Sequence, residues 1–171
     1  GTERIFEASR KIFCDYIINI QGDEVLIDPL NIDKLIRTIK LNKKYEYFIG
    51  ITPFYLSKRK NVFKAVINNN KELIYCSRED IPSASITKKN NWLKVVFIVG
   101  YHRKSLAKFV KWHPTKNEIR EPNEFLRILD NGLKIKTVKF PKSHISLDTF
   151  SDLFKIKKLM KVDKYFINKY Y

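Results

Sequence analysis

The stretch IINIQGDEVLIDP, residues 17–29, decides how the rest of the sequence is interpreted. Its apolar beginning, preceded by Tyr16, is rich in β-branched residues and predicts a buried strand. The strand ends at Gln21-Gly22-Asp23, where a glycine permits a sharp turn or the close approach of a ligand. In open α/β sheets ligands bind at the carboxyl ends of strands, so Asp23 is a candidate for handling a metal or a phosphate. A solvated polar turn is the alternative.

Length and composition indicate an ordinary globular protein. The 171 residues favour one domain with a sizeable core, and 44% of them are hydrophobic and 30% charged. The apolar runs are too short to span a membrane, and the first residues do not resemble a secretory signal. The isolated Cys14 and Cys76 match no metal spacing and are typical of reduced thiols. We therefore expect a cytoplasmic protein without a membrane span.

The net charge of +16 is the unusual bulk property. A basic surface attracts polyanions such as nucleic acid, anionic membranes and nucleotides. However, the lysines are dispersed, and no nucleic-acid-binding motif accompanies them. We therefore favour a solvated lysine-rich surface and expect no specific nucleic-acid partner.

Local patterns predict helices and strands in mixed order. Residues 2–13 favour a helix, and so do residues 31–40, with Asn31 as the N-cap. A hairpin is expected from residues 61–67 and 72–77, and residues 45–53 and 92–101 favour strands. After a helix at 103–112 come an amphipathic helix at 118–132 ending at Gly132, a strand at 133–140 and a last helix with Asp148 as its N-cap.

Several motifs resemble those of one enzyme family. QGDEVLID resembles the QGDEPLI signature of the CMP-Kdo synthetases (3-deoxy-manno-octulosonate cytidylyltransferases), and departs from it at Val25, where the family usually has proline. GTERI, SRxxIP, GY, ExxExLR and LDTxxDL follow the family's order over nearly the whole chain. The resemblance implies an α/β fold of the nucleotide-diphospho-sugar transferase type. That fold has a mostly parallel twisted sheet, flanking helices and a protruding β-hairpin.

The resemblance also implies which residues bind the nucleotide. GTERIFEA is similar to the family's SGTDRIAEA, so Gly1, Thr2 and Arg4 are expected to face the nucleotide, with an exposed helix charge as the alternative for Arg4. Gln21 of the signature is assigned to the same group.

Four further residues are assigned to the acid sugar by the same resemblance. Arg78 falls on the arginine of SRxxIP, and its planar guanidinium suits a carboxylate; pairing with Glu79 or Asp80 is the alternative. Tyr101 matches the family's KHIGIYGYR. Glu121 and Glu124 match acidic positions that face sugar hydroxyls, with a helix first-turn charge as the alternative.

Three positions depart from the family pattern on the sugar side. Val95 stands where the family has histidine, Phe97 where it has glycine and Phe125 where it has glutamine. These departures leave the identity of the sugar open.

HISLDTFSDL resembles the family's GVDTPEDL, whose first aspartate is a metal ligand, which implies Asp23 and Asp148 as the metal-binding and catalytic pair. Mg²⁺ is usually held by one or two carboxylates, with waters and substrate phosphates completing its coordination. Both aspartates are expected in strand-end loops, which a parallel sheet brings together at one edge. The ion would neutralise charge on the α-phosphate and orient the attacking hydroxyl.

Residues 1–171 are therefore expected to form a single cytidylyltransferase-like domain. Nothing in them matches the family's basic A-R-x-x-S-x-R-L-x-x-K loop, so we expect the N-terminal triphosphate-binding segment to lie outside this sequence. The implied function is transfer of CMP from CTP to the anomeric hydroxyl of a 3-deoxy-2-keto acid sugar, with Kdo favoured, by a Mg²⁺-dependent homodimer in lipopolysaccharide biosynthesis. The alternatives are another acid, such as a sialic-acid-like sugar or a phosphonate, and a non-catalytic basic binding domain.

Overall fold

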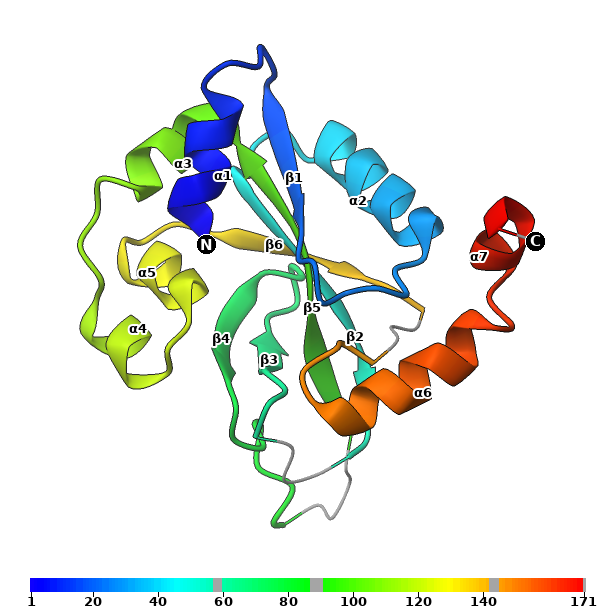
Figure 1. The fold of residues 1–171 in the computed structure, drawn as a ribbon. Coiled ribbons are helices and arrows are strands. Elements are labelled where there is room, and N and C mark those ends of the chain that lie inside the picture. Colours follow the sequence, from blue (N-terminus) through cyan, green and yellow to red (C-terminus); the bar gives the residue numbers. More distant parts are fainter. Residues whose placement is uncertain (57–59, 87–90, 142–144, 171) are drawn as a thin grey trace.

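A computed structural model describes residues 1–56, 60–86, 91–141 and 145–170 of the chain (Figure 1). Helices and strands alternate irregularly along it. In chain order they are α1 (Thr2–Ser9), β1 (Tyr16–Ile20), α2 (Pro29–Leu41), β2 (Tyr47–Phe54), β3 (Lys64–Ile67), β4 (Leu73–Ser77), β5 (Trp92–His102), α3 (Arg103–Phe109), α4 (Lys116–Arg120), α5 (Glu124–Asp130), β6 (Ile135–Lys139), α6 (Phe150–Met160) and α7 (Lys164–Tyr170).

The strands form one mixed sheet in the order β4-β3-β5-β2-β6, and β1 pairs separately with β5. Only β2 and β6 pair in parallel among the described strands, so the expectation of a mostly parallel sheet is wrong. Parallel neighbouring strands need a crossover connection, usually a helix. Here the chain enters β5 after the antiparallel β3–β4 pair, with no helix in the described residues between them. Even so, β1, β2 and β6 share one direction, because β1 and β2 both oppose β5 and β6 is parallel to β2.

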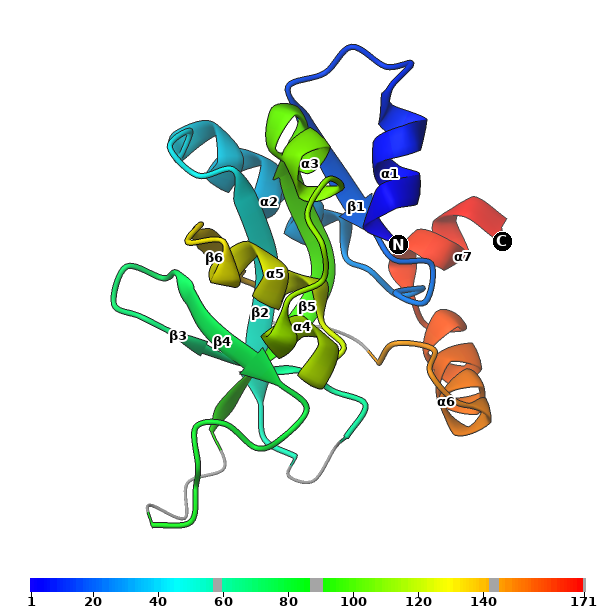
Figure 2. The ribbon, with the colours of Figure 1, turned by 90° about the vertical axis from the view of Figure 1, so that its left-hand side faces the viewer.

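Helices cover both faces of the sheet (Figures 1 and 2). One face packs against α3 and α5, and the other packs against α2. Successive side chains of the central strands point to opposite faces of the sheet and so contribute to both cores. Representative members are Ile49, Val95, Val99, Leu106, Phe109 and Leu126 on the first face, and Leu35, Ile39, Phe48, Val96, Ile98 and Phe140 on the second.

The first two helices differ at their ends from the sequence prediction. The N-cap of α2 is Asp28, whose Oδ1 accepts a hydrogen bond of 2.9 Å from Leu30 N, with Pro29 in the first turn. The prediction of Asn31 as N-cap is therefore wrong. α1 ends at Ser9, whose hydroxyl donates to Phe6 O at 2.7 Å, a side-chain bond that competes with helix continuation.

The predicted helix at 118–132 is two helices, α4 and α5. Pro122 interrupts it, because proline has no N–H to donate within a helix. Asn123 then caps α5 by accepting from Phe125 N at 3.0 Å. Gly132 terminates α5 as expected: it has φ +74°, and its N–H donates to Leu129 O at 2.9 Å.

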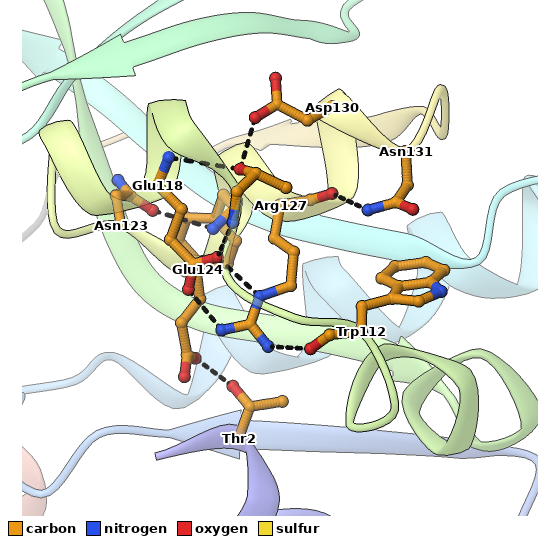
Figure 3. Close-up of polar contacts among 10 residues, drawn as sticks. Thr2, Trp112, Glu118, Asn123, Glu124, Arg127, Asp130 and Asn131 are labelled. Atoms are coloured by element: carbon orange, nitrogen blue, oxygen red, sulfur yellow. Dashed lines mark hydrogen bonds and ion pairs between the residues drawn. The ribbon is translucent and has the colours of Figure 1, made fainter.

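A buried ion pair joins α4 to α5 (Figure 3). Arg127 Nε donates to Glu118 Oε2 at 2.6 Å, and the two side chains are 8% and 9% exposed. Arg127 Nη1 also donates to Trp112 O at 3.1 Å, and its guanidinium lies 4.6 Å from the centre of the Phe109 ring. One arginine therefore ties α3, α4 and α5 together.

We predict that Arg127→Leu destabilises the protein by about 3–5 kcal/mol, because it leaves the Glu118 carboxylate buried without its partner. The measurement is equilibrium urea unfolding. The matched control is Arg120→Leu, an exposed arginine of α4, which should change the unfolding free energy by less than about 0.5 kcal/mol. Equal effects of the two substitutions would contradict this assignment.

Glu72 anchors the β3–β4 pair to the rest of the sheet. Its carboxylate accepts from Tyr45 Oη at 2.8 Å, Asn68 Nδ2 at 2.8 Å and Lys134 Nζ at 3.2 Å. The hydrogen bonds from Asn68 and Tyr45 lower the pKa of Glu72 from 4.5 to about 2, and Lys134 adds to this lowering. The charged form of Glu72 is therefore the form that the fold stabilises.

We predict a pH-dependent difference between the wild type and Glu72→Gln. Because the folded pKa of about 2 lies below the ordinary 4.5, the contribution of Glu72 is fully present above pH 4.5 and disappears as the pH falls through 2. Urea midpoints measured across this range should show the wild type more stable at neutral pH and the two proteins converging in acid. A difference that does not change with pH would refute the prediction.

Candidate active site

The candidate site forms where two strands share one edge of β5. β2 pairs along the full opposite edge, so β1, paired with residues 98–102, and β3, paired with residues 93–94, lie on the same side of β5. Gln21 N donates to Phe97 O at 3.4 Å, and Val95 N donates to Phe63 O at 2.8 Å. The chain thus leaves this edge at Gln21 and returns to it at Phe63, and the two segments face each other across a break.

A cleft lies at this break in strand pairing. It consists of two adjoining cavities of about 390 and 230 Å³ that share Gln21, Asp23, Asn61, Phe63, Phe97 and Asp148. Eight of the ten site residues expected from the sequence line the larger cavity: Gly1, Thr2, Gln21, Asp23, Arg78, Tyr101, Glu124 and Asp148. Arg4 and Glu121 are not among its lining residues.

Two hydrogen bonds hold the loop after β1 against the segment after β6. Leu147 N donates to Asp23 O at 2.9 Å, and Ser146 Oγ donates to Glu24 Oε1 at 3.1 Å. Burial is the main cause that raises the pKa of the Glu24 carboxyl. Because β1 and β6 run in the same direction, the two loops lie at one end of the sheet, although the sheet is not mostly parallel.

Asp148 is not an N-cap, contrary to the sequence prediction. Thr149 caps α6 instead: its Oγ1 accepts from Asp152 N at 3.3 Å, and its own N–H donates to Asp152 Oδ2 at 3.0 Å. The Asp148 carboxylate therefore takes no part in capping the helix. It accepts from Asn61 Nδ2 at 3.0 Å and lines the cleft.

Asp23 carries a buried oxygen that the fold does not use. Its Oδ1 is buried and has no hydrogen-bond partner in the part of the chain that the structure describes. Buried carboxylate oxygens are normally paired or bound to a cation. The described residues contain no cluster of three or more His, Cys, Asp or Glu suited to a metal. Two carboxylates on one cavity, one of them with an unpaired buried oxygen, are a ligand set that suits Mg²⁺, which takes its remaining ligands from water and phosphate.

The packing of the protein does not explain Gly22. Its φ lies outside the left-handed region, and a Cβ at this position would meet no atom within 4 Å. The chain does turn sharply at this point, because Glu24 N donates to Gln21 O at 3.1 Å across Gly22 and Asp23. The turn therefore accounts for the course of the backbone, and close approach of a ligand stays a prediction.

Among the polar residues of the cleft that the sequence interpretation missed are Asn61 and Lys94. Lys94 is half-buried on β5, and burial is the main cause that lowers its pKa, while Glu24 and Asp148 oppose that shift. The match of its position to the first residue of KHIGIYGYR was the available signal. Asn61 lies before β3 and falls on the asparagine of the family's PNVVKVV, which was the available signal for it, although no local pattern identified its bond to Asp148.

Arg78 is held on an aromatic ring. Its guanidinium lies 4.0 Å from the centre of the Phe63 ring, and its Nη1 donates to Glu121 O at 3.0 Å. The fully buried Lys64 binds Arg78 O and also pairs with Asp80 at 3.3 Å. Asp80 thus has Lys64 as its ion-pair partner, and Arg78 remains on the cleft wall.

The opposite rim comes from α1 and α5. The Thr2 hydroxyl donates to Glu124 Oε2, which joins the two helices at their N-terminal ends (Figure 3). Tyr101 is buried behind them, and burial raises its pKa. Arg4 is exposed on α1, and Glu121 accepts from Ser77 Oγ at 2.7 Å. The ligand-binding roles assigned to these residues stay predictions.

Similar solved structures define the class of fold. A putative glucose-1-phosphate thymidylyltransferase from Bacillus anthracis aligns over 93% of this chain and 60% of its own with a TM-score of 0.61 and 16% identity, which shows the fold alone. A CMP-2-keto-3-deoxy-manno-octonic acid synthetase complexed with CTP aligns with a TM-score of 0.87 and 28% identity over 94% of this chain and 68% of its own. The fold is that of the sugar nucleotidyltransferases.

A sequence-family model described as cytidylyltransferase matches residues 1–161, and the chain belongs to the cytidylyltransferase family. Its relatives include the 3-deoxy-manno-octulosonate cytidylyltransferase of Elusimicrobium minutum, 32% identical over 94% of this chain and 69% of the relative. That of Fusobacterium nucleatum is 37% identical over 90% of this chain and 64% of the relative. The chain thus spans about two thirds of the length of these relatives.

We predict that Asp23→Asn does not lower the stability of the protein. The substitution removes charge from a buried oxygen without a partner, whose burial costs the fold about 1–3 kcal/mol. Glu118→Gln is the matched control, because the same chemical change at a paired acid should destabilise. The readout is the urea midpoint without divalent cations. A loss of stability in Asp23→Asn as large as in Glu118→Gln would show that Asp23 has a structural role.

Proposed function

We propose that this chain transfers CMP from CTP to the anomeric hydroxyl of a 3-deoxy-2-keto acid sugar, with release of pyrophosphate. Kdo is the favoured acceptor, because several relatives are 3-deoxy-manno-octulosonate cytidylyltransferases. The observation that carries the proposal is one cleft lined by Asp23, Asp148 and Arg78. It combines two carboxylates suited to a cation with a guanidinium suited to an acid.

Different residues of the cleft are assigned to the nucleotide and to the sugar. Asp23 and Asp148 would hold Mg²⁺, with Asn61 orienting the Asp148 carboxylate. The bound ion would withdraw charge from the α-phosphate and align the attacking hydroxyl. Arg78 binds the sugar carboxylate through its planar fork. Nucleotidyl transfer requires in-line placement and charge stabilisation, so a nucleophilic side chain is not needed.

Gly1, Thr2, Arg4 and Gln21 contribute to the nucleotide site in this proposal, and Tyr101, Glu121 and Glu124 to the sugar site. Lys94 and Lys155 line the smaller cavity and add positive charge near Asp148.

A homodimer, a cytoplasmic location and a role in lipopolysaccharide biosynthesis complete the proposal. Edge strand β4 exposes Ile74, which is 53% accessible, and offers an apolar contact for a second copy. Within the described part of the chain, no helix combines the length and the apolar character that crossing a membrane requires.

The test is pyrophosphate release with CTP, Mg²⁺ and Kdo, measured with the longest form of the protein against a control without sugar. Asp23→Asn and Asp148→Asn should each lower the sugar-dependent rate by about 10²–10³-fold, as expected when one electrostatic group at the reacting centre is lost. Asp33→Asn, an exposed acid on α2, is the matched control and should leave the rate unchanged.

Near wild-type turnover by either cleft variant would refute the two-carboxylate site. If a folded full-length protein released no pyrophosphate with any 2-keto acid sugar, the non-catalytic binding domain would replace the proposal. Steeply salt-dependent binding of polyanions would then be the positive sign of that alternative.

A further inference from the structure

The side of α6 that faces away from the protein carries phenyl rings and lysines next to each other. Phe150 and Phe154 are 85% and 65% exposed, whereas Ile156 is 2% exposed and faces the protein. Residues three and four apart are neighbours on a helix surface, so the exposed residues form one strip that continues into the turn after α6. We call this strip the α6 patch, and its members are Phe150, Phe154, Lys157, Lys158, Lys161 and Val162.

The α6 patch lies at the rim of the molecule. Both ribbon views place α6 and α7 outside the helices α2, α3 and α5, which cover the sheet (Figures 1 and 2). The exposed phenyl rings therefore contribute nothing to the two cores of the fold, which lie against the sheet. Large apolar side chains that gather on a surface typically mark an interaction site.

The lysines of the α6 patch have no acidic partners among the described residues. No described carboxylate forms an ion pair with Lys157, Lys158 or Lys161. The two aspartates of this region are occupied as helix caps. Asp152 belongs to the capping box of α6, and Asp163 accepts from two backbone N–H groups at the start of α7, each at 3.0 Å. The positive charge of the patch is therefore available to a partner.

Phenyl rings beside unpaired lysines match the surface of an anionic bilayer. Ammonium groups on long stems reach the lipid phosphates, while the rings leave water among the headgroups. Clusters of about four to eight Lys or Arg on a helix are typical of proteins that bind anionic lipids. Five lysines lie between residues 155 and 164, which is within this range.

Other occupants fit the α6 patch less well. A nucleic acid would pair with the lysines and stack on the rings, but it leaves the exposed Val162 in water. A second copy bound through the same patch would set lysines against lysines, because a two-fold interface joins identical surfaces. A bilayer uses both the charged and the apolar side chains.

We propose that the α6 patch binds the surface of an anionic membrane, with its lysines at the lipid phosphates and with Phe150 and Phe154 inserted among the headgroups. The protein binds this surface peripherally, so the contact requires no spanning helix. The inference goes beyond the proposed reaction and does not depend on it, because its test measures binding to lipid in the absence of substrates.

Vesicle flotation with the longest form of the protein tests the inference. One set of vesicles contains equal amounts of phosphatidylglycerol and phosphatidylethanolamine, and the other contains phosphatidylcholine alone, which has no net charge. At low salt the protein should float with the anionic vesicles and stay in solution with the neutral ones, because attraction by lysines requires anionic headgroups. Absence of binding to the anionic vesicles, or equal binding to both sets, would overturn the inference.

A pair of variants with equal charge separates the α6 patch from the net charge of +16. Replacing the three lysines of the patch with glutamine should lower partitioning by about a hundredfold, since each lysine near an anionic surface contributes about fivefold. The control combines Lys111→Gln, Lys116→Gln and Arg120→Gln, which are exposed in and before α4, on the other side of the molecule (Figure 1). It should lower partitioning by less than about fivefold. Equal losses in the two variants would refute a specific patch.

The double substitution Phe150→Gln and Phe154→Gln tests the apolar part of the contact. It should weaken binding to the anionic vesicles by at least about tenfold, because the rings no longer leave water. Ile119→Gln, at a residue of α4 that is 67% exposed, is the matched control and should bind as the wild type does. Since all three side chains are exposed, the variants should keep the urea midpoint of the wild type.

Three outcomes of the phenylalanine experiment contradict the inference. Unchanged partitioning of the folded double variant would reduce the contact to charge alone. Tighter binding of the wild type to duplex DNA than to the anionic vesicles would assign the α6 patch to nucleic acid. A change in the oligomeric state of the double variant, measured by sedimentation, would assign the patch to a contact between copies.

Discussion

The geometry of the site depends on how β5 divides one of its edges between two strands. β1 takes one end of that edge and β3 takes the other, while β2 pairs along the whole opposite edge. The sheet is continuous on one side of β5 and interrupted on the other. Because the chain leaves the edge at Gln21 and returns at Phe63, side chains from both segments meet at the interruption. The cleft is therefore a consequence of strand pairing.

The polar and aromatic parts of the cleft are stabilised in different ways. Backbone and side-chain hydrogen bonds clamp the loop of Asp23 to the segment before Asp148, which fixes the positions of the two carboxylates. The opposite wall is fixed by packing, since Phe97 contacts both Phe63 and Phe125. Arg78 belongs to both parts, because it stacks on Phe63 and is anchored through the buried Lys64. The contacts that hold the aromatic side of the cleft are therefore separate from the hydrogen bonds that hold the carboxylates.

Sequence patterns located most elements and most of the site because both depend on local signals. The apolar run of β1, the glycine after α5 and the QGDE signature are each short and contiguous. The errors arose where a local signal had two physical solutions. Asp148 and Thr149 are both good N-cap residues, and only the capping box with Asp152 shows that Thr149 is used. The same ambiguity placed the N-cap of α2 at Asn31 instead of Asp28.

Strand direction and long-range pairs were beyond the reach of local patterns. The antiparallel course of β5 follows from the hairpin before it, and no residue of β5 encodes it. Asn61 contacts Asp148 across 87 positions of sequence, and a single asparagine gives no hint of such a partner. The stacking of Phe97 on Phe125 joins two positions that depart separately from the family pattern, and their contact became visible only in three dimensions.

The central claim is that Asp23 and Asp148 bind one cation together. Titration of Mn²⁺ in the presence of CTP, followed by electron paramagnetic resonance, measures this binding directly for the wild type, Asp23→Asn, Asp148→Asn and the double variant. The account predicts one site in the wild type, a large loss of affinity in each single variant and little further loss in the double variant, because two ligands of one ion are not independent. Wild-type affinity in either single variant, or additive losses from two separate sites, would contradict it.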